Sequence, residues 1–228
     1  FRTGHTTLYC FSPPVMLATI IIELGLAGWI LARYTLHQPR RIILALLVGL
    51  AGFQMAEYGV CGGAEGTLVW SRIGYILITM LPALGLHLIS TLLGRPRTIL
   101  VWTIYAIAGS LATILAVVPA TLNSSICTGN YTVFRLSEPF STVWSYYYTG
   151  AVLVGLVVAT VSAGLASSTK RRALGWLALG YASFIGPTLI IYYSSPGVRA
   201  GIPSIMCGFA VILALILGLK IAPLTNRS

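Results

Sequence analysis

Polar residues divide this chain into seven stretches of mostly apolar side chains, each long enough to cross a lipid bilayer. A spanning helix needs about 20 such residues. The stretches are continuously apolar, whereas strands of a membrane barrel alternate between apolar and polar side chains, so helices are predicted. We expect a single all-α, seven-transmembrane-helix bundle over residues 1–228, with spans at 14–33, 42–62, 69–93, 99–120, 143–167, 172–193 and 200–221.

The connections between these spans are short, except for a long one at 121–142. Seven spans use up nearly all of the 228 residues, which leaves no room for an appended kinase, nucleotide-binding or DNA-binding domain. The composition agrees, because 57% of the residues are hydrophobic and only 8% are charged. These values lie far outside the range of a soluble globular domain.

The net charge of +10 is explained by the position of the basic residues. Most of them fall in alternate connections, and the positive-inside rule places those connections in the cytoplasm. The N-terminus is then outside and the C-terminus inside a cytoplasmic (inner) cell membrane, with basic side chains near lipid headgroups. Nucleic-acid binding is disfavoured, because it would require a continuous basic face. The predicted inner side has Arg33, Arg40, Arg41, Arg95, Arg97, Lys170, Arg171, Arg172, Lys220 and Arg227; the outer side has Arg2, Arg72, Arg135 and Arg199.

Three of the four cysteines fall at or near the predicted outer side, which is the oxidising side. A bridge between Cys61 and Cys127 would hold the long connection over the mouth of the bundle. Cys10 is the rival partner, and unpaired thiols remain a third alternative, because spacing does not determine connectivity. Cys207 is expected inside the seventh helix.

Acidic residues inside a membrane are costly and indicate function by default. Glu23 falls near the middle of the first span and Glu57 in the outer third of the second. Gln54, Glu57, Tyr58 and Cys61 follow helical spacing, so we expect them to share a face that points into the bundle.

The third span has a second polar stripe, with Arg72 at its outer end, then Tyr75, and His87 nearer the cytoplasm. Arg72 and Glu57 have similar depth, so they could pair across neighbouring helices, either at a ligand site or only to fix helix register. His87 is too deep to share a metal site with Glu57. We expect His87 to hydrogen-bond to a neighbouring helix, and we predict no metal site.

No catalytic constellation is evident, since the chain has no Asp and only three His. We therefore expect a protein without enzymatic activity, and the sequence leaves any cofactor open. Proline inside two spans, at Pro82 and Pro187, predicts kinks or hinges there.

Segments 53–58 (FQMAEY), 70–75 (WSRIGY) and 81–87 (LPALGLH) resemble the seven-helix N-terminal sensor region of bacterial and archaeal membrane histidine kinases. The resemblance covers mainly the second and third spans. It implies an outer N-terminus and a seventh helix that leads toward a cytoplasmic signalling domain. Because we expect no output domain after Thr225, the resemblance implies one of three things: a sensor module detached from its kinase, a partner that acts through another protein, or a descendant used as a structural subunit.

Three functions follow from these observations. The first is a receptor-like sensor that binds a small or lipophilic ligand in an outward-facing pocket between the first three helices, with Glu23, Gln54, Glu57, Tyr58, Arg72, Tyr75 and His87 as candidate ligand-binding residues. The second is an accessory or assembly subunit whose apolar faces bind partner helices, lipid or pigment. The third is a small transporter that uses Glu23 and Glu57.

Overall fold

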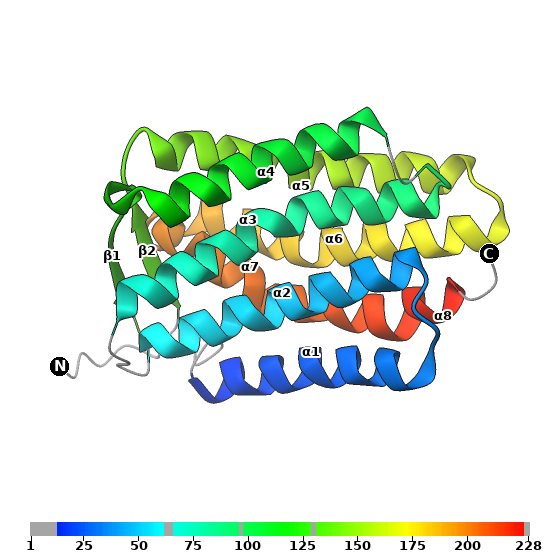
Figure 1. The fold of residues 1–228 in the computed structure, drawn as a ribbon, viewed down its shortest axis with the longest axis horizontal. Helices are drawn as coiled ribbons and strands as arrows, with labels where there is room; N and C mark the ends of the chain where they lie inside the picture. Colours follow the sequence, from blue (N-terminus) through cyan, green and yellow to red (C-terminus); the bar gives the residue numbers. More distant parts are fainter. Residues whose placement is uncertain (1–12, 62–65, 96–97, 129–130, 226–228) are drawn as a thin grey trace.

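The computed structural model describes residues 13–61, 66–95, 98–128 and 131–225. Seven helices in it are long and apolar enough to cross a membrane. They lie side by side, and a two-stranded hairpin covers one end of the bundle (Figure 1). We call this end the hairpin end. The bounds are α1 Pro13–Arg33, α2 Gln38–Cys61, α3 Thr67–Leu92, α4 Ile99–Val117, β1 Leu122–Cys127, β2 Thr132–Leu136, α5 Phe140–Leu165, α6 Ser168–Ser194, α7 Ile202–Ile216 and α8 Ala222–Leu224.

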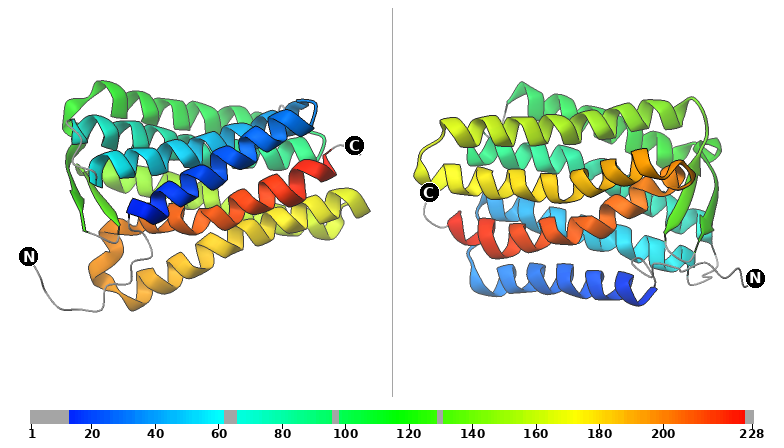
Figure 2. Two further views of the ribbon diagram at one scale, coloured as in Figure 1. Left: turned by 90° about the horizontal axis from the view of Figure 1, so that it is seen from below. Right: turned by 180° about the vertical axis from the view of Figure 1, so that it is seen from behind.

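Helix α3 is the centre of the bundle, because it contacts α2, α4, α5 and α6. Helix α7 packs against α1, α2 and α6. Helices α1 and α4 lie at opposite edges of the bundle (Figures 1 and 2). A site enclosed on several sides can therefore be built around α3 and α7, whereas α1 and α4 have broad outward faces.

The outward faces are apolar. Ile21 on α1 is 69% exposed, Trp102 on α4 is 66% exposed and Ile190 on α6 is 69% exposed. Removing apolar surface from water stabilises a protein by about 25 cal/mol per Å². Side chains of this kind would forgo that stabilisation if water surrounded the bundle. Polar and charged groups are instead buried inside, among them Glu23, Glu57 and Thr79. This inverted distribution and the seven long helices identify a multi-pass membrane protein.

The expected proline positions lie inside helices, and neither helix ends there. Pro82 lies within α3 and Pro187 within α6. Helix α7 loses its regular pattern later, where a π-helical turn, η3 (Leu217–Ile221), connects it to α8. Single π-helical turns of this kind are rare and often occur at functional sites.

The long connection expected at 121–142 is not an irregular loop. A 3₁₀ turn, η1 (Pro119–Thr121), leads into β1, and β1 pairs with β2 in antiparallel register. The pairing is irregular between Leu122 and Ser124, as in a β-bulge. Strands of six and five residues are too short to give a clear alternating pattern beside the long apolar spans, which explains why the sequence prediction missed them.

At the opposite end of the bundle, Arg40 is fully buried although it was expected only as a topology-setting charge. Its Nη1 donates to the carbonyl of Thr35 at 2.7 Å, and its Nε donates to the carbonyl of Ala222 at 3.3 Å. The guanidinium also lies 4.7 Å from the centre of the Tyr34 ring. Arg40 therefore joins the α1–α2 connection and α8 to the first turn of α2.

Candidate functional site

A pocket of about 490 Å³ opens at the hairpin end. This volume lies within the range of about 300–1,000 Å³ that is usual for small-molecule sites. The residues around it come from α3, the hairpin, the start of α5, the 3₁₀ turn η2 (Pro196–Gly201) and the start of α7. We call it the hairpin pocket. Its lining residues are Tyr75, Asn123, Ser124, Phe134, Arg135, Leu136, Ser141, Trp144, Ser145, Arg199 and Pro203.

One wall of the hairpin pocket is aromatic. The ring of Tyr75 meets Phe134 edge-on at 5.4 Å and Trp144 at 5.0 Å between ring centres. The indole Nε1 of Trp144 donates to Thr79 Oγ1 at 2.8 Å, and Thr79 Oγ1 donates in turn to the carbonyl of Tyr75. The Trp144 ring also stacks on Tyr148 at 4.9 Å between ring centres, so its N–H and one ring face are already used. The wall is therefore fixed in position and mainly apolar.

The other lining groups are polar, and two of them are cationic. Arg135 comes from β2 and Arg199 from η2. Ser124 is the cross-strand partner of Arg135, and both line the pocket. No acidic side chain lines it among the residues that the structure describes. The pocket therefore combines an apolar wall with an electropositive rim.

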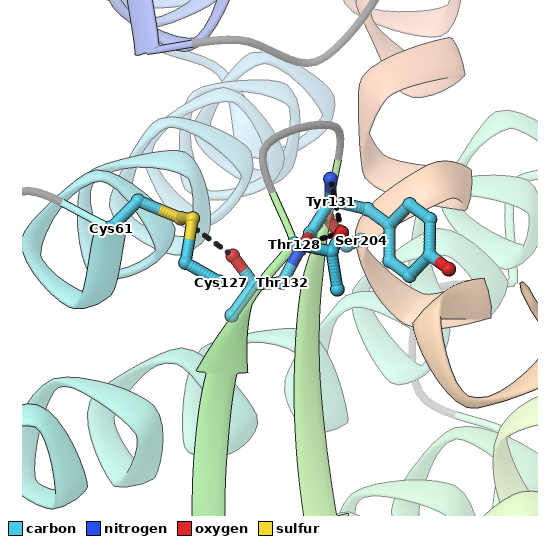
Figure 3. Close-up of a disulfide and its surroundings, with 6 residues drawn as sticks. All are labelled: Cys61, Cys127, Thr128, Tyr131, Thr132 and Ser204. Carbon is cyan, nitrogen blue, oxygen red and sulfur yellow. Dashed lines mark hydrogen bonds between the residues drawn. A yellow bond between two sulfur atoms is a disulfide. The ribbon is translucent and has the colours of Figure 1, made fainter. Parts of the chain in front are cut away.

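The hairpin is fastened to the bundle at three points. A disulfide joins Cys127 at the end of β1 to Cys61 at the end of α2, with a Cα–Cα distance of 5.2 Å (Figure 3). The backbone N–H of Thr132 donates to Ser204 Oγ of α7 at 3.1 Å. The ring of Tyr131 packs on Gly201, where a β-carbon would collide with it. The Cys61–Cys127 alternative is thus confirmed, whereas Cys10 lies outside the described residues.

Two acidic side chains are buried inside the bundle, Glu23 on α1 at 0% exposure and Glu57 on α2 at 1%. The hydroxyl of Ser204 hydrogen-bonds to the Glu57 carboxyl. Among the described residues, Glu57 Oε1 and both carboxyl oxygens of Glu23 have no hydrogen-bond partner. The free thiol of Cys207 on α7 is buried as well.

A smaller cavity of about 40 Å³ lies deeper in the bundle and is lined almost entirely by apolar side chains. It has room for one or two waters. Pro82 and Gly85 of α3 line it, together with Tyr181 of α6 and Cys207 of α7. Gly85 allows the Tyr181 hydroxyl to approach α3, because a β-carbon there would overlap the hydroxyl oxygen.

The suggested pairing of Arg72 with Glu57 is wrong. Arg72 donates instead to the carbonyls of Leu115 at 2.9 Å and Pro119 at 2.7 Å. Carbonyls at the end of a helix have no intrahelical partner and carry its negative partial charge, so the end of α4 and the following turn η1 supply better acceptors. Arg72 therefore joins α3 to α4, and among the described residues Glu57 has no cationic partner.

The other predicted site residues are dispersed. Gln54 is buried at 2% exposure, but Tyr58 is 37% exposed and does not point into the bundle as expected. His87 lies far from the hairpin end. Its two ring nitrogens contact Gln38 at 3.3 Å and Tyr105 at 3.1 Å. Its expected hydrogen bonding to neighbouring helices is confirmed. Of the predicted ligand-binding residues, only Tyr75 lines the hairpin pocket.

The hairpin pocket lies between α3, α5, the hairpin and η2. The expected ligand pocket between the first three helices stays a prediction. Sequence reasoning counted Arg135 and Arg199 among the basic residues of the outer side but did not single them out. The sequence did contain a signal for them, because the positive-inside rule disfavours basic residues on the outer side and these two arginines are exceptions to it. Among the described residues, no group of three His, Cys, Asp or Glu could hold a metal ion.

Comparison with known proteins does not assign this chain to a family. No protein-family model matches it, and none of the curated proteins matches it. The function must therefore be argued from the hairpin pocket and from the buried carboxyls.

Proposed function

We propose that this protein is a non-enzymatic, sensor-like membrane protein that binds a small ligand in the hairpin pocket and acts through a partner protein. The proposal rests mainly on the fact that the residues lining the hairpin pocket belong to several different elements. They come from α3, the hairpin, α5, η2 and α7, so a bound ligand would connect segments far apart in the chain. A ligand shifts a conformational equilibrium through contacts that differ between two conformations, and we propose that the hairpin pocket provides such contacts.

Helix α7 is the element best suited to transmit the effect. Pro203 lines the pocket at the start of α7, and Ser204 beside it holds the hairpin. The helix then runs to η3 and α8 at the opposite end, where Arg40 binds the carbonyl of Ala222. Small helix shifts of about 1–2 Å are a common form of switching. In the proposed orientation, the hairpin pocket faces outside and α8 faces the cytoplasm, as the basic residues favour.

Native mass spectrometry of the protein, extracted from its own membrane in mild detergent, tests this function. We expect a small molecule to stay bound, and Ser145→Trp to displace it by filling the hairpin pocket. Ser110→Trp, on the exposed face of α4, is the matched control and should keep the molecule. A fixed set of heavier partner proteins and no small molecule would instead favour the accessory-subunit alternative.

One observation favours a transporter as a second candidate. Glu23 and Glu57 are buried carboxyls without a cationic partner among the described residues, and groups of this kind mark ion or proton paths in membranes. Proton- or ion-coupled flux into vesicles that Glu57→Gln abolishes would support transport. Equal flux in the variant and the parent protein would exclude Glu57 as the coupling residue, and no flux in either would argue against transport.

A further inference from the structure

We propose that the hairpin pocket binds an organic anion, with a carboxylate or phosphate group attached to a flat apolar body. This inference rests on the proposed function and adds the ligand class. Its first support is charge. Arg135 and Arg199 approach the pocket from different elements, and among the described lining residues there is no acid to neutralise them. Guanidinium groups match carboxylate and phosphate oxygens in geometry as well as in charge.

Arg199 is held in place before any ligand arrives. Its Nε donates to the carbonyl of Tyr192 at 3.1 Å, and its guanidinium lies 4.7 Å from the centre of the Tyr192 ring. These contacts occupy one N–H and one face of the guanidinium. Among the described residues no hydrogen bond uses its terminal nitrogens, so their donors remain for a ligand, and the fixed side chain loses little conformational freedom on binding.

Arg135 is positioned by the hairpin. It pairs across the strands with Ser124, next to the irregular pairing that follows Leu122. Bulges re-aim neighbouring side chains, and here Asn123 also lines the pocket. The disulfide at the far end of β1 fixes the hairpin on α2. One cation, one amide and one hydroxyl are thus presented together by a fastened element.

The aromatic wall selects the rest of the ligand. Tyr75 and Trp144 contact each other edge-on at 5.0 Å, and the indole N–H of Trp144 is satisfied by Thr79. An apolar ring can pack on this wall at no cost in lost hydrogen bonds, and aromatic contacts of this kind are favourable beyond their buried area. A strongly hydrated inorganic anion would leave the wall unused.

Glu138 is an acidic residue just before α5, three positions ahead of the pocket-lining Ser141. It does not line the pocket. Its carboxylate accepts hydrogen bonds from the hydroxyls of Ser141 and Thr142, so it is held by the first turn of α5. With two arginines against this one carboxylate, the described charges at the pocket leave a net positive potential for an incoming anion.

Calorimetric titration of the detergent-purified protein with benzoate and phenyl phosphate tests the inference, with neutral benzamide as the matched ligand. We expect both anions to bind and benzamide to bind much more weakly. Arg135→Gln and Arg199→Gln should each weaken anion binding by about ten- to a hundredfold, the usual range for a lost charged hydrogen bond. Arg171→Gln is the control, because Arg171 is exposed at the opposite end.

A second arm separates a soluble anion from a lipid headgroup, since both share this chemistry. The protein and the two Arg→Gln variants are placed in nanodiscs of phosphatidylglycerol or phosphatidylcholine, and retained lipid is measured by native mass spectrometry. Arginine-dependent retention of phosphatidylglycerol, without binding of the soluble probes, would support the anion site and identify its source as lipid.

The inference is overturned if benzamide binds as well as benzoate, or if the arginine variants bind both anions like the parent protein. It is also overturned if neither the soluble probes nor phosphatidylglycerol bind. In each case the proposed function is judged separately, because a native small molecule displaced by Ser145→Trp would still show that the hairpin pocket is a binding site.

Discussion

The hydroxyl of Ser204 lies between Thr132 and Glu57, accepting from the backbone N–H of Thr132 at 3.1 Å and bonding to the Glu57 carboxyl. Ser204 is 1% exposed, so neither contact is replaced easily by solvent. One side chain of α7 therefore connects the hairpin to α2. This arrangement makes Ser204 the first position to test.

Replacing Ser204 with Ala should destabilise the fold by about 1–3 kcal/mol, because the buried N–H of Thr132 loses its acceptor. Reversible denaturation in mixed micelles measures the change. Thr160→Ala is the control, since Thr160 is exposed and bonds only to a carbonyl of its own helix. Equal stability of the two variants would show that the Thr132 contact contributes nothing.

Removing the disulfide should loosen the hairpin. The Cys61–Cys127 bridge spans 66 residues, and bridges of this kind typically contribute about 2–4 kcal/mol. We expect Cys61→Ser with Cys127→Ser to lower the stability by an amount in this range and to raise amide hydrogen exchange in β1 and β2. Cys207→Ala is the control, because Cys207 is a free thiol. Unchanged exchange in the hairpin would contradict the pinning role.

Gly85→Ala should be destabilising by about 1–3 kcal/mol, because the added methyl overlaps the Tyr181 hydroxyl. Tyr181→Phe removes that oxygen, so the double variant should be more stable than the sum of the two single changes predicts. Gly109→Ala, on α4 with open space around its α-carbon, should be neutral or stabilising. Additive effects of Gly85→Ala and Tyr181→Phe would exclude this contact.

Glu138 should make the stability of the start of α5 depend on pH. Hydrogen bonds from Ser141 and Thr142 hold the pKa of its carboxyl below the ordinary value of 4.5. A lowered pKa in the folded state means that the stabilisation is complete above 4.5 and is lost as the pH falls through the folded value.

Thermal unfolding between neutral pH and about pH 3 tests this dependence on the titration of Glu138. The parent protein should be more stable than Glu138→Gln at neutral pH, and the difference should disappear in acid. A difference that stays constant over the whole range would mean that the charge of Glu138 is not its cause.

The sequence predicted the seven helices well, because each apolar span is a property of its own residues. The observed helix ends differ from the predicted ones by a few residues, because local caps determine where a helix begins and ends. Thr98, for example, caps α4 by accepting from the N–H of Val101. Cys61–Cys127 was among the predicted pairings because both positions follow from helix topology. The hairpin was missed, since its pairing is non-local and its strands are short.

The candidate site could not be predicted for a related reason. Helical spacing placed Glu57 and Gln54 correctly inside, but it could not show that Tyr58, one position further, lies at the exposed edge of the same face. Depth alone suggested that Arg72 would meet Glu57, whereas the free carbonyls at the end of α4 bind it. Tyr75 is the predicted residue that reaches the pocket. Its ring partners Phe134 and Trp144 come from segments distant in sequence, so helical spacing could not place them beside it.

Helix α2 is held at both of its ends, by the disulfide at Cys61 and by the Arg40 contact with Ala222. These two attachments lie a full helix length apart, on opposite sides of the bundle (Figure 1). The hairpin and α8 are thus connected to opposite ends of the same helix. Reduction of the disulfide would therefore free one end of α2 from the hairpin, while the Arg40 contact with Ala222 still holds the other end.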